Sequence, residues 1–434
     1  MKRIIFDIST ILKGIGNRAE RTGIYFCAYN VLKEMTIRDD VELAFYNCAP
    51  QWCYYKETLQ EMLGISNICL INCSERLIKL SKLWIAIFHK KTFYYDKKEN
   101  FKGFFYSLYG FIIRKIAEIE ERMTHKRGGG INGFDFYFSP MLQAPEYILK
   151  NSKLTNVILL HDAIPFIYPE YYPEMNQHKK YWIKRLVESM NNEELFFANS
   201  QNTKKDFLGY KNGIMPQRIK VVYHACSEQF MPCYDEEKLS IIKHKYNIPN
   251  NKKYVFSLCT IEPRKNLIRI VKTFVEFIKR NQIEDLILVL GGGHWENFIS
   301  EFYNNIEKIQ DISAIVHRVG YIDDGDLPYL YSGSFFFIYT SQYEGFGVPP
   351  LEAMKCGCPV IVSNSSSIPE VVGDAGIQIE WNSDEQHIHA YEKYYFNEAY
   401  RLKQAQKGLL RADMFSWKKA VDNMLNEMES DRNV

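Results

Sequence analysis

A strand-to-helix junction in the last third of the chain carries the side chains best suited to chemistry. The apolar stretch 335–340 predicts a buried strand, and residues 341–352 follow it as Ser-Gln-Tyr-Glu-Gly-Phe-Gly-Val-Pro-Pro-Leu-Glu. Glu344 lies in the turn at the strand end, and Glu352 lies within the expected helix. A carboxylate in such a turn can accept hydrogen bonds from sugar hydroxyls, and one on the helix can accept from both hydroxyls of a ribose. Two solvated glutamates are the alternative interpretation.

The turn between these glutamates has the composition of an anion site. Gly345 and Gly347 allow the backbone to approach a ligand closely. The amides of Phe346, Gly347 and Val348 are expected to point outward at the start of a helix, where the helix dipole favours an anion. The two prolines that follow suit a first helical turn. We therefore expect an anionic group to be held at this turn.

Three further side chains that can bond to a ligand lie at or after the ends of expected strands. Arg264 and Lys265 follow the expected strand 254–258, and His161 ends the expected strand 157–161. Arg supplies a planar fork of hydrogen-bond donors and Lys a point charge. A lysine after a strand is usually solvated, and a lone histidine is usually a satisfied core or loop residue, so these alternatives stay open.

The rest of the chain predicts how these residues are positioned. Short apolar runs alternate with longer helical patterns, which indicates parallel sheets covered by helices on both faces. This alternation of strands and helices is interrupted near residues 230–232 and then begins again. We therefore expect two doubly wound α/β domains, 1–232 and 233–412. Ligands of such sheets bind at the carboxyl ends of the strands, so two facing domains would form a cleft. The expected strands are 3–6, 41–46, 134–139, 157–161, 195–199, 220–223, 254–258, 286–291, 315–319, 335–340 and 359–363.

Composition excludes several classes of protein. The chain has 434 residues, 46% of them hydrophobic and 24% charged, with a net charge of +2. This is typical of a globular protein and lacks the polycationic signature of nucleic-acid binding. It contains no run of 18 apolar residues that could span a membrane, and its first apolar run is too short for a signal peptide. The ten cysteines form no CxxC pair, and we expect reduced thiols in a cytoplasmic protein.

Residues 76–127 differ from the rest of the chain. They contain 13 Lys and Arg against 5 Asp and Glu, interleaved with 11 aromatic residues. Leu77, Leu80, Trp84 and Ile87 have helical spacing. The pattern is typical of a helix at an anionic membrane interface, which would make the protein peripheral at the inner face of the cell membrane. A helix pair packed on the domain with a solvated basic face is the alternative, and we expect no nucleic-acid partner.

Taken together, several short sequence motifs in the second half of the chain resemble the signature of retaining family-4 glycosyltransferases with the GT-B fold. The Glu-x7-Glu pair of residues 344–352 has their strand–turn–helix setting, and further blocks match in the same order. Many members carry Gly-Arg early in the phosphate-binding element, where this chain has Cys259-Thr260, so we expect Arg264 to supply the guanidinium instead. The other matching blocks are 259–267, 288–291, 319–321, 357–363 and 367–376.

The first half adds weaker matches. Arg-Thr-Gly-Ile-Tyr at 21–25 and His-Asp-Ala-Ile-Pro at 161–165, with Glu-Pro-Arg-Lys-Asn at 262–266, resemble bacterial mannosyltransferases of surface-polysaccharide pathways. In that subgroup the glycine corresponding to Gly23 lies beside the donor phosphates. The chain end resembles a helix that crosses back to the first domain, so 413–434 is assigned to that domain.

The resemblance implies two Rossmann-like domains facing a cleft and retaining transfer of a hexose from a nucleotide sugar. The favoured donor is GDP-mannose, and the acceptor would be a glycan or a lipid-linked oligosaccharide. Because no carboxylate nucleophile is placed, the resemblance implies front-face attack within an ion pair, with His161 holding sugar and phosphate. The implied catalytic residues are His161 and Glu344, and the implied donor-binding residues are Gly23, Arg264, Lys265, Gly345, Phe346, Gly347, Val348 and Glu352.

No cofactor or metal is expected. The run Asp323-Asp324-Gly325-Asp326 could be taken for the Asp-x-Asp metal site of the other large glycosyltransferase fold, but its position favours a helix N-cap. His317, His387 and His389 are expected at the surface. A sugar-nucleotide epimerase of the same fold and a non-catalytic sugar-nucleotide binder are the other functions considered. Donor turnover would separate them, since it gives transfer, epimer formation or neither.

Overall fold

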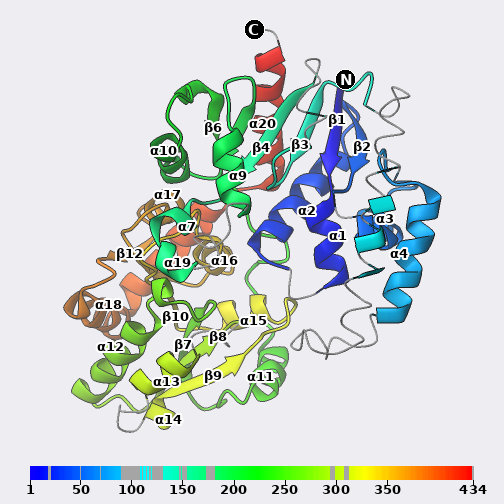
Figure 1. Cartoon of the computed structure of the whole chain (residues 1–434). Helices are drawn as coiled ribbons and strands as arrows, with labels where there is room; N and C mark the ends of the chain where they lie inside the picture. Colours follow the sequence, from blue (N-terminus) through cyan, green and yellow to red (C-terminus); the bar gives the residue numbers. More distant parts are fainter. Residues whose placement is uncertain are drawn as a thin grey trace.

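The structure is a computed structural model of the chain, drawn in Figure 1. Most of the segment 76–127 lies outside the residues that it describes. Every helix among the described residues is too short or too polar to cross a lipid bilayer. The described residues are 1–17, 21–48, 50–68, 70–88, 108–109, 111–113, 115–116, 119, 131–145, 148, 154–172, 181–293, 299–306 and 312–432.

The first half of the chain forms a six-stranded parallel sheet in the order β2-β1-β3-β4-β5-β6. Its central strands are near-continuous apolar runs, as strands buried on both faces must be. The strand order reverses between β1 and β3, where Ile4 pairs with Phe136. The strands are β1 (Lys2–Asp7), β2 (Val41–Tyr46), β3 (Phe136–Ser139), β4 (Thr155–Leu160), β5 (Leu195–Ala198) and β6 (Ile219–Val221).

The second half forms another six-stranded parallel sheet, in the order β12-β11-β10-β7-β8-β9. The order reverses between β7 and β10, where Phe337 pairs with Phe256. Such a switch point opens a crevice at the carboxyl ends of the two strands. The strands are β7 (Lys253–Leu258), β8 (Leu286–Gly291), β9 (Val316–Gly320), β10 (Phe336–Tyr339), β11 (Val360–Ser363) and β12 (Gly376–Ile379).

Helices cover both sheets, and Figure 1 shows one sheet in each of two lobes. This arrangement confirms the predicted pair of Rossmann-like domains. Helices of the first half are α1 (Ser9–Gly16), α2 (Gly23–Thr36), α3 (Lys56–Leu63), α4 (Glu75–Phe88), α7 (Ile164–Ile167), α9 (Trp182–Ser189) and α10 (Gln201–Tyr210). Those of the second half are α11 (Glu236–Lys245), α12 (Leu267–Arg280), α13 (Ile299–Ile306), α14 (Ile312–Ile315), α15 (Leu327–Ser332), α16 (Val348–Lys355), α17 (Ile368–Val372), α18 (Asp384–Phe396) and α19 (Glu398–Ala412).

The last helix, α20 (Trp417–Arg432), returns to the first sheet, where it packs against α2 and β5 (Figure 1). Its buried face includes Val421, Met424 and Met428. Ion pairs reinforce the contact, with Lys2 Nζ 2.9 Å from Glu429 Oε2 and a further pair between Arg218 and Asp431. The C-terminal helix therefore belongs physically to the first lobe.

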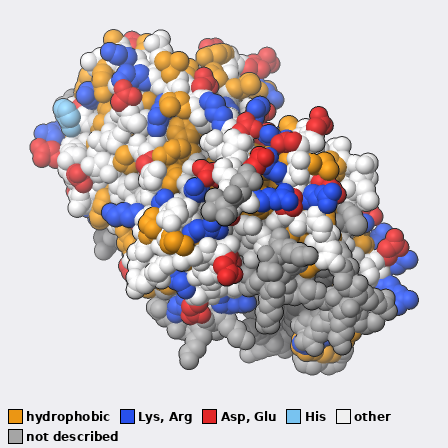
Figure 2. Space-filling view, turned by 90° about the horizontal axis from the view of Figure 1, so that it is seen from above, with side chains coloured by type: hydrophobic (Ala, Val, Ile, Leu, Met, Phe, Trp, Pro, Cys, Tyr) orange, Lys and Arg blue, Asp and Glu red, His pale blue; other side chains and the backbone are white. Residues whose placement is uncertain are grey.

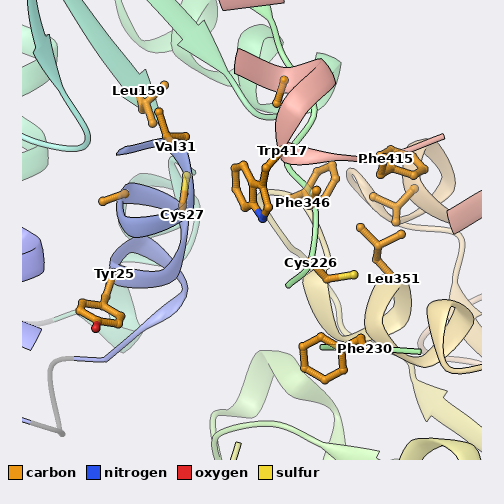
Figure 3. Close-up of a cluster of buried hydrophobic side chains, with 14 of the residues drawn as sticks. Tyr25, Cys27, Val31, Leu159, Cys226, Phe230, Phe346, Leu351, Phe415 and Trp417 are labelled. Atoms are coloured by element: carbon orange, nitrogen blue, oxygen red, sulfur yellow. The ribbon is translucent and has the colours of Figure 1, made fainter. Parts of the chain in front are cut away.

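One apolar core runs through the junction of the two halves. Val31 and Leu159 of the first half belong to the same buried cluster as Phe346 and Leu351 of the second, and Trp417 lies between them (Figure 3). Contact across the junction is therefore built into the core and is not limited to the surface. On the face drawn in Figure 2, basic and acidic side chains lie side by side, which fits the near-zero net charge.

Candidate active site

Two cations lie at the carboxyl end of β7. A short 3-10 turn over Pro263–Lys265 is followed by Asn266, which has a φ of 62° and precedes α12. Asparagine tolerates this left-handed conformation because its short side chain bonds to nearby backbone. Here its Nδ2 donates to the carbonyl oxygen of Trp381 at 2.6 Å. The turn thereby holds Arg264 and Lys265 at the switch point, both of them buried.

A buried carboxylate lies between the two cations. Glu344 follows β10 and is only 7% exposed. Lys265 Nζ lies 2.6 Å from Glu344 Oε1, and Arg264 Nη1 lies 3.1 Å from Oε2. The Tyr339 hydroxyl donates to Glu344 Oε1 at 2.8 Å and accepts from Lys265 Nζ at 2.7 Å. Fixed donors therefore engage both oxygens of Glu344.

This environment keeps Glu344 ionised. Burial alone would raise the pKa of the carboxyl, but Lys265 and Arg264 outweigh burial and lower the pKa of Glu344 to about 2. Glu262 adds a second carboxylate, with its Oε2 2.8 Å from Arg264 Nε. Two cations thus face two carboxylates, so the cluster is close to neutral before any anionic ligand arrives.

Serine side chains from the segment after β11 fix the turn that carries Glu344. Ser366 Oγ accepts from the Glu344 amide at 2.9 Å. Ser367 Oγ donates to the carbonyl oxygens of Glu344 and Phe346, both at 2.9 Å. Gly347 has a φ of 104°, which favours glycine, and it forms the N-cap of α16. Pro349 and Pro350 have no backbone N–H, so the Val348 amide is the one that the first three residues of α16 offer, directly after this fixed turn.

Gly345 brings this turn against the first half of the chain. A Cβ at Gly345 would lie 2.2 Å from the carbonyl oxygen of His161, so only glycine fits. The Gly345 carbonyl oxygen accepts from Ser200 Oγ at 2.7 Å and from Thr203 Oγ1 at 3.1 Å. We expected Gly345 to allow a ligand to approach. In the structure its missing side chain makes room for the backbone of the other domain.

Further contacts between the halves surround Gly345. The Glu370 carboxylate accepts from the amides of Gln201 and Asn202 at 2.7 and 2.9 Å, and so caps the first turn of α10. The Tyr343 hydroxyl donates to Asp206 Oδ2 at 2.7 Å. Burial raises the pKa of Asp206 to about 6, although this bond from Tyr343 opposes the rise.

His161 lies on the first-domain side of the site as a neutral imidazole. Its Nε2 is 2.6 Å from the carbonyl oxygen of Pro140. A carbonyl oxygen only accepts, so Nε2 carries the proton and Nδ1 is left with a lone pair. Burial lowers the pKa of His161 to about 4, although the bond to Pro140 opposes the drop. At neutral pH, His161 can therefore accept a hydrogen bond from a hydroxyl, but it does not offer a positive charge to a phosphate.

A thiol and a second imidazole lie next to His161. Cys27 Sγ is 3.4 Å from His224 Nε2, and the rings of His161 and His224 are 5.5 Å apart. These three side chains could each offer one metal-ligand atom, and the three atoms lie within 4.8 Å of one another. Burial raises the pKa of the Cys27 thiol and lowers the pKa of His224. The group is therefore uncharged at neutral pH.

The other residues that we predicted to bind the sugar donor lie on α16, in the turn before it and at the start of α2. Glu352 on α16 accepts from the Tyr331 hydroxyl at 2.9 Å, and burial raises its pKa to about 7. Phe346 is buried with its ring 5.6 Å from His224, so only its backbone could meet a ligand. Gly23 is the first residue of α2, and a Cβ there would meet no protein atom within 4 Å. Val348 starts α16.

The surface position predicted for His387 is wrong. His387 is fully buried on α18, where its Nε2 lies 3.0 Å from Thr340 Oγ1, because its side of the helix packs on the sheet. The N-cap prediction for the acidic run is confirmed in position, since Asp326 is the N-cap of α15, although its side chain makes no capping bond. Its Oδ2 lies 2.6 Å from Lys245 Nζ, which also binds Asp323. The acidic run is therefore an ion-pair site for a lysine.

Sequence reasoning missed two tyrosines. Tyr339 ties Lys265 to Glu344, and Tyr331 holds Glu352. A signal for Tyr339 existed, since it adds a hydroxyl at the end of an otherwise apolar strand. Tyr331 lies on a short helix far from Glu352 in sequence, and its pattern resembles any buried aromatic.

Known proteins agree with this architecture. The family model for glycosyl transferases group 1 matches residues 240–409. O-antigen chain mannosyltransferase B of Escherichia coli is 30% identical over 321 residues, which cover 74% of this chain and 82% of that protein. Serotype-specific mannosyltransferase WbdA of E. coli is 27% identical over 262 residues, which cover 60% of this chain and 32% of that longer protein.

Solved structures extend the likeness over nearly the whole chain. HepE of Anabaena, crystallised in complex with UDP, superposes with a TM-score of 0.62 at 16% identity, covering 99% of this chain and all of that one. WaaG, a glycosyltransferase involved in lipopolysaccharide biosynthesis, gives a TM-score of 0.60 at 12% identity and covers 98% of each chain. Together with the sequence relatives, these findings show that the chain is a glycosyltransferase of the group 1 family with the GT-B fold.

Proposed function

We propose that this glycosyltransferase retains the anomeric configuration as it transfers a hexose, with mannose from GDP-mannose as the favoured donor. The acceptor would be a lipid-linked or polysaccharide glycan of the cell surface. The observation that carries the proposal is the Glu344 carboxylate held between Lys265 and Arg264 at the switch point. The next residue, Gly345, lies against the backbone of His161. A relative that is 30% identical and named an O-antigen mannosyltransferase supports the choice of sugar and pathway.

The two cations are suited to the leaving group. Transfer breaks the bond between the anomeric carbon and a diphosphate oxygen, and the barrier falls when that developing charge is stabilised. Lys265 and Arg264 are already fixed by Glu344 and Tyr339, so they need little rearrangement when the diphosphate arrives. The Val348 amide and the dipole at the start of α16 add a partial positive charge.

The sugar would lie between the two domains. Glu344 is ionised and can accept from sugar hydroxyls, while the neutral His161 can accept through Nδ1. Both oxygens of Glu344 are held by cations, so this carboxylate is poorly placed to attack the anomeric carbon. We therefore favour front-face transfer: the acceptor oxygen bonds the anomeric carbon as the diphosphate leaves, and the acceptor proton passes to a diphosphate oxygen.

We also propose that the reaction needs no metal ion, since Lys265 and Arg264 supply the charge that a divalent cation would otherwise supply. Transfer measured in excess EDTA should equal transfer in its absence. A rate that is lost with EDTA and restored by one divalent ion would refute this part, and the group Cys27, His161 and His224 would then be the first place to look for the ion.

The first experiment is a thermal-shift screen against GDP, UDP, dTDP and their sugar conjugates. A donor at about 100 times its dissociation constant adds about 2.7 kcal/mol of stability. The preferred donor is then incubated with acceptor oligosaccharides, and the anomeric configuration of the product is read by NMR. An inverted product would refute retention, an epimerised donor would indicate an epimerase, and binding without turnover would indicate a sugar-nucleotide binder.

The segment 76–127 supports a peripheral site at the inner face of the cell membrane, although most of it lies outside the described residues. In the part that is described, Leu77 and Ile113 share a small core. Around this core, Arg76, Lys79 and Lys82 are exposed on α4. Large apolar side chains are also exposed in the described part of the segment, namely Leu83, Leu108, Phe111, Ile112 and Ile119.

Exposed apolar and basic side chains on one segment fit an anionic lipid surface. Flotation with vesicles that contain anionic lipid should therefore carry the protein upward, and vesicles of zwitterionic lipid alone should carry less. No binding to either vesicle would refute this part and favour a helix pair that only packs on the domain.

A further inference from the structure

Two cysteines meet at the base of α4. Cys53 lies in the 3-10 turn Pro50–Tyr55, and Cys73 lies two residues before α4 begins. Their Sγ atoms are 2.6 Å apart, which is within about 0.6 Å of the length of a covalent disulfide bond. The two thiols therefore come together from segments 20 residues apart in sequence without any rearrangement of the fold.

The surroundings of the pair suit thiol–disulfide exchange. Cys53 is completely buried, whereas Cys73 is partly exposed and can meet a soluble oxidant. Asn47 Nδ2 donates to Cys53 Sγ at 3.2 Å, which fixes the position of this sulfur beside Cys73. Asn72 holds this asparagine, because its Oδ1 accepts from the Asn47 amide at 3.1 Å and its Nδ2 donates to the Asn47 carbonyl oxygen at 2.7 Å.

We propose that Cys53 and Cys73 form a reversible disulfide in the presence of a low-molecular-weight disulfide such as oxidised glutathione. The Cys73 thiolate attacks one glutathione sulfur, and the first glutathione thiolate leaves. The Cys53 thiolate then attacks the Cys73 sulfur, and the second glutathione thiolate leaves. The protein thiols give up two electrons and two protons, and one oxidised glutathione becomes two reduced molecules.

The bridge would restrain the basic, aromatic segment at its origin. Trp52, Tyr54 and Tyr55 of the 3-10 turn pack around Leu77 of α4. A covalent link between the turn and the residue two positions before α4 shortens the loop that can open, so local opening of α4 becomes rarer. The start of α4 would therefore be held more firmly in the oxidised protein than in the reduced protein.

The test is a redox titration of the full chain in mixtures of reduced and oxidised glutathione, followed by acid quenching and peptide mapping without reduction. We expect a cross-linked peptide that contains Cys53 and Cys73, a mass loss of about 2 Da, and full reversal by dithiothreitol. Uncross-linked Cys53 at the oxidising end of the titration, or a bridge from either cysteine to another thiol, would overturn the proposal.

Matched variants test the order of attack. In Cys53→Ser the partly exposed Cys73 should stop at a stable glutathione adduct, whereas in Cys73→Ser the buried Cys53 should stay unmodified. Cys48→Ser is the control, because Cys48 is an exposed cysteine close in sequence and its loss should leave the cross-link intact. Hydrogen exchange on the wild type gives a second measurement. Amides at the start of α4 should exchange several-fold more slowly after oxidation, and equal exchange would overturn the proposed restraint.

Discussion

The carboxyl ends of the two sheets meet at the candidate active site, but they bring opposite kinds of side chain to it. On the second sheet, Lys265 and Arg264 are paired with Glu344, whose pKa is lowered to about 2. On the first sheet, burial lowers the pKa of His161 to about 4 and raises the pKa of the Cys27 thiol. Burial is common to both sides, so the difference comes from the partners. A side with charged partners suits a diphosphate, and a side with neutral groups suits sugar hydroxyls.

Removing a cation from the charged side should have the largest effect. In Lys265→Ala we expect kcat/KM for the donor to fall roughly 10²- to 10³-fold, because one fixed donor to the leaving group is lost. The thermal shift produced by the nucleoside diphosphate should also disappear. The matched control is Lys243→Ala, since Lys243 is also buried but donates to the carbonyl oxygens of Asn250 and Lys252. Equal losses in both variants would mean that the effect is structural.

Removing the carboxylate should cost stability as well as activity. In Glu344→Gln the free energy of unfolding should fall by about 3 kcal/mol, because two buried cations lose their shared partner. The midpoint of urea denaturation measures this. Because the pKa of Glu344 is lowered, its stabilising contribution is present above the ordinary carboxyl pKa and is lost only as the pH falls toward about 2. A wild-type protein that loses this stability between pH 7 and 5 would contradict the pairing.

The neutral side should respond differently. In His161→Ala we expect turnover to fall roughly 10- to 100-fold, as for a lost hydrogen bond to a sugar hydroxyl. The thermal shift with nucleoside diphosphate alone should stay as in the wild type. Because the pKa of His161 is about 4, it stays neutral and no rate change above about pH 5.5 should come from it. Loss of nucleotide binding in this variant would show that both sides hold the diphosphate.

Removing the Tyr339 hydroxyl, which bonds to both Glu344 and Lys265, should have a smaller effect on stability and donor binding. Tyr339→Phe removes the donor to Glu344 and the acceptor for Lys265 but keeps the ring. We expect about 1 kcal/mol less stability and a similar loss in donor binding. Tyr246→Phe is a control that removes a hydroxyl bonded to Asp326, outside the cation pair. An unchanged donor affinity in Tyr339→Phe would mean that Lys265 is held by Glu344 alone.

A pH profile gives the smallest effect. Burial raises the pKa of Glu352 to about 7, so its carboxylate protonates as the pH falls through neutrality. If this carboxylate binds the ribose, kcat/KM for the donor should drop about threefold from about pH 7.5 to about pH 6.5. This dependence of kcat/KM on pH should be absent in Glu352→Gln, whose rate should be low at every pH. If the variant keeps the same pH dependence, another group must be its source.

The sequence predicted the sheets well where strands are buried and poorly at one edge. The expected strands 41–46 and 286–291 match β2 and β8 residue for residue, because polar residues bound each apolar run. The edge strand β12 (Gly376–Ile379) was not predicted, since only its last residue is buried and a four-residue run with glycine and glutamine lacks a strand pattern. Its pairing with β11 depends on contacts that are distant in sequence.

The candidate site was predictable where residue type and strand end coincide. Arg264, Lys265 and Glu344 each follow a strand, and parallel strands put their carboxyl ends on one edge. Nothing local indicated that Gly345 contacts the backbone of His161, because that contact depends on how the two domains meet. His387 was misjudged because no long-range partner is visible in the sequence, although buried Ile388 and Tyr391 follow it on α18.

The return of α20 to the first sheet sets an order for folding during synthesis. Residues of α20 such as Trp417 and Leu425 are buried in the core shared with α2. They leave the ribosome after every strand of both sheets has been made. Until α20 has been synthesised, part of the apolar surface of the first domain stays exposed. Such an exposed surface favours aggregation and chaperone binding. A premature stop codon before α20 would leave the second sheet complete and the first domain unfinished.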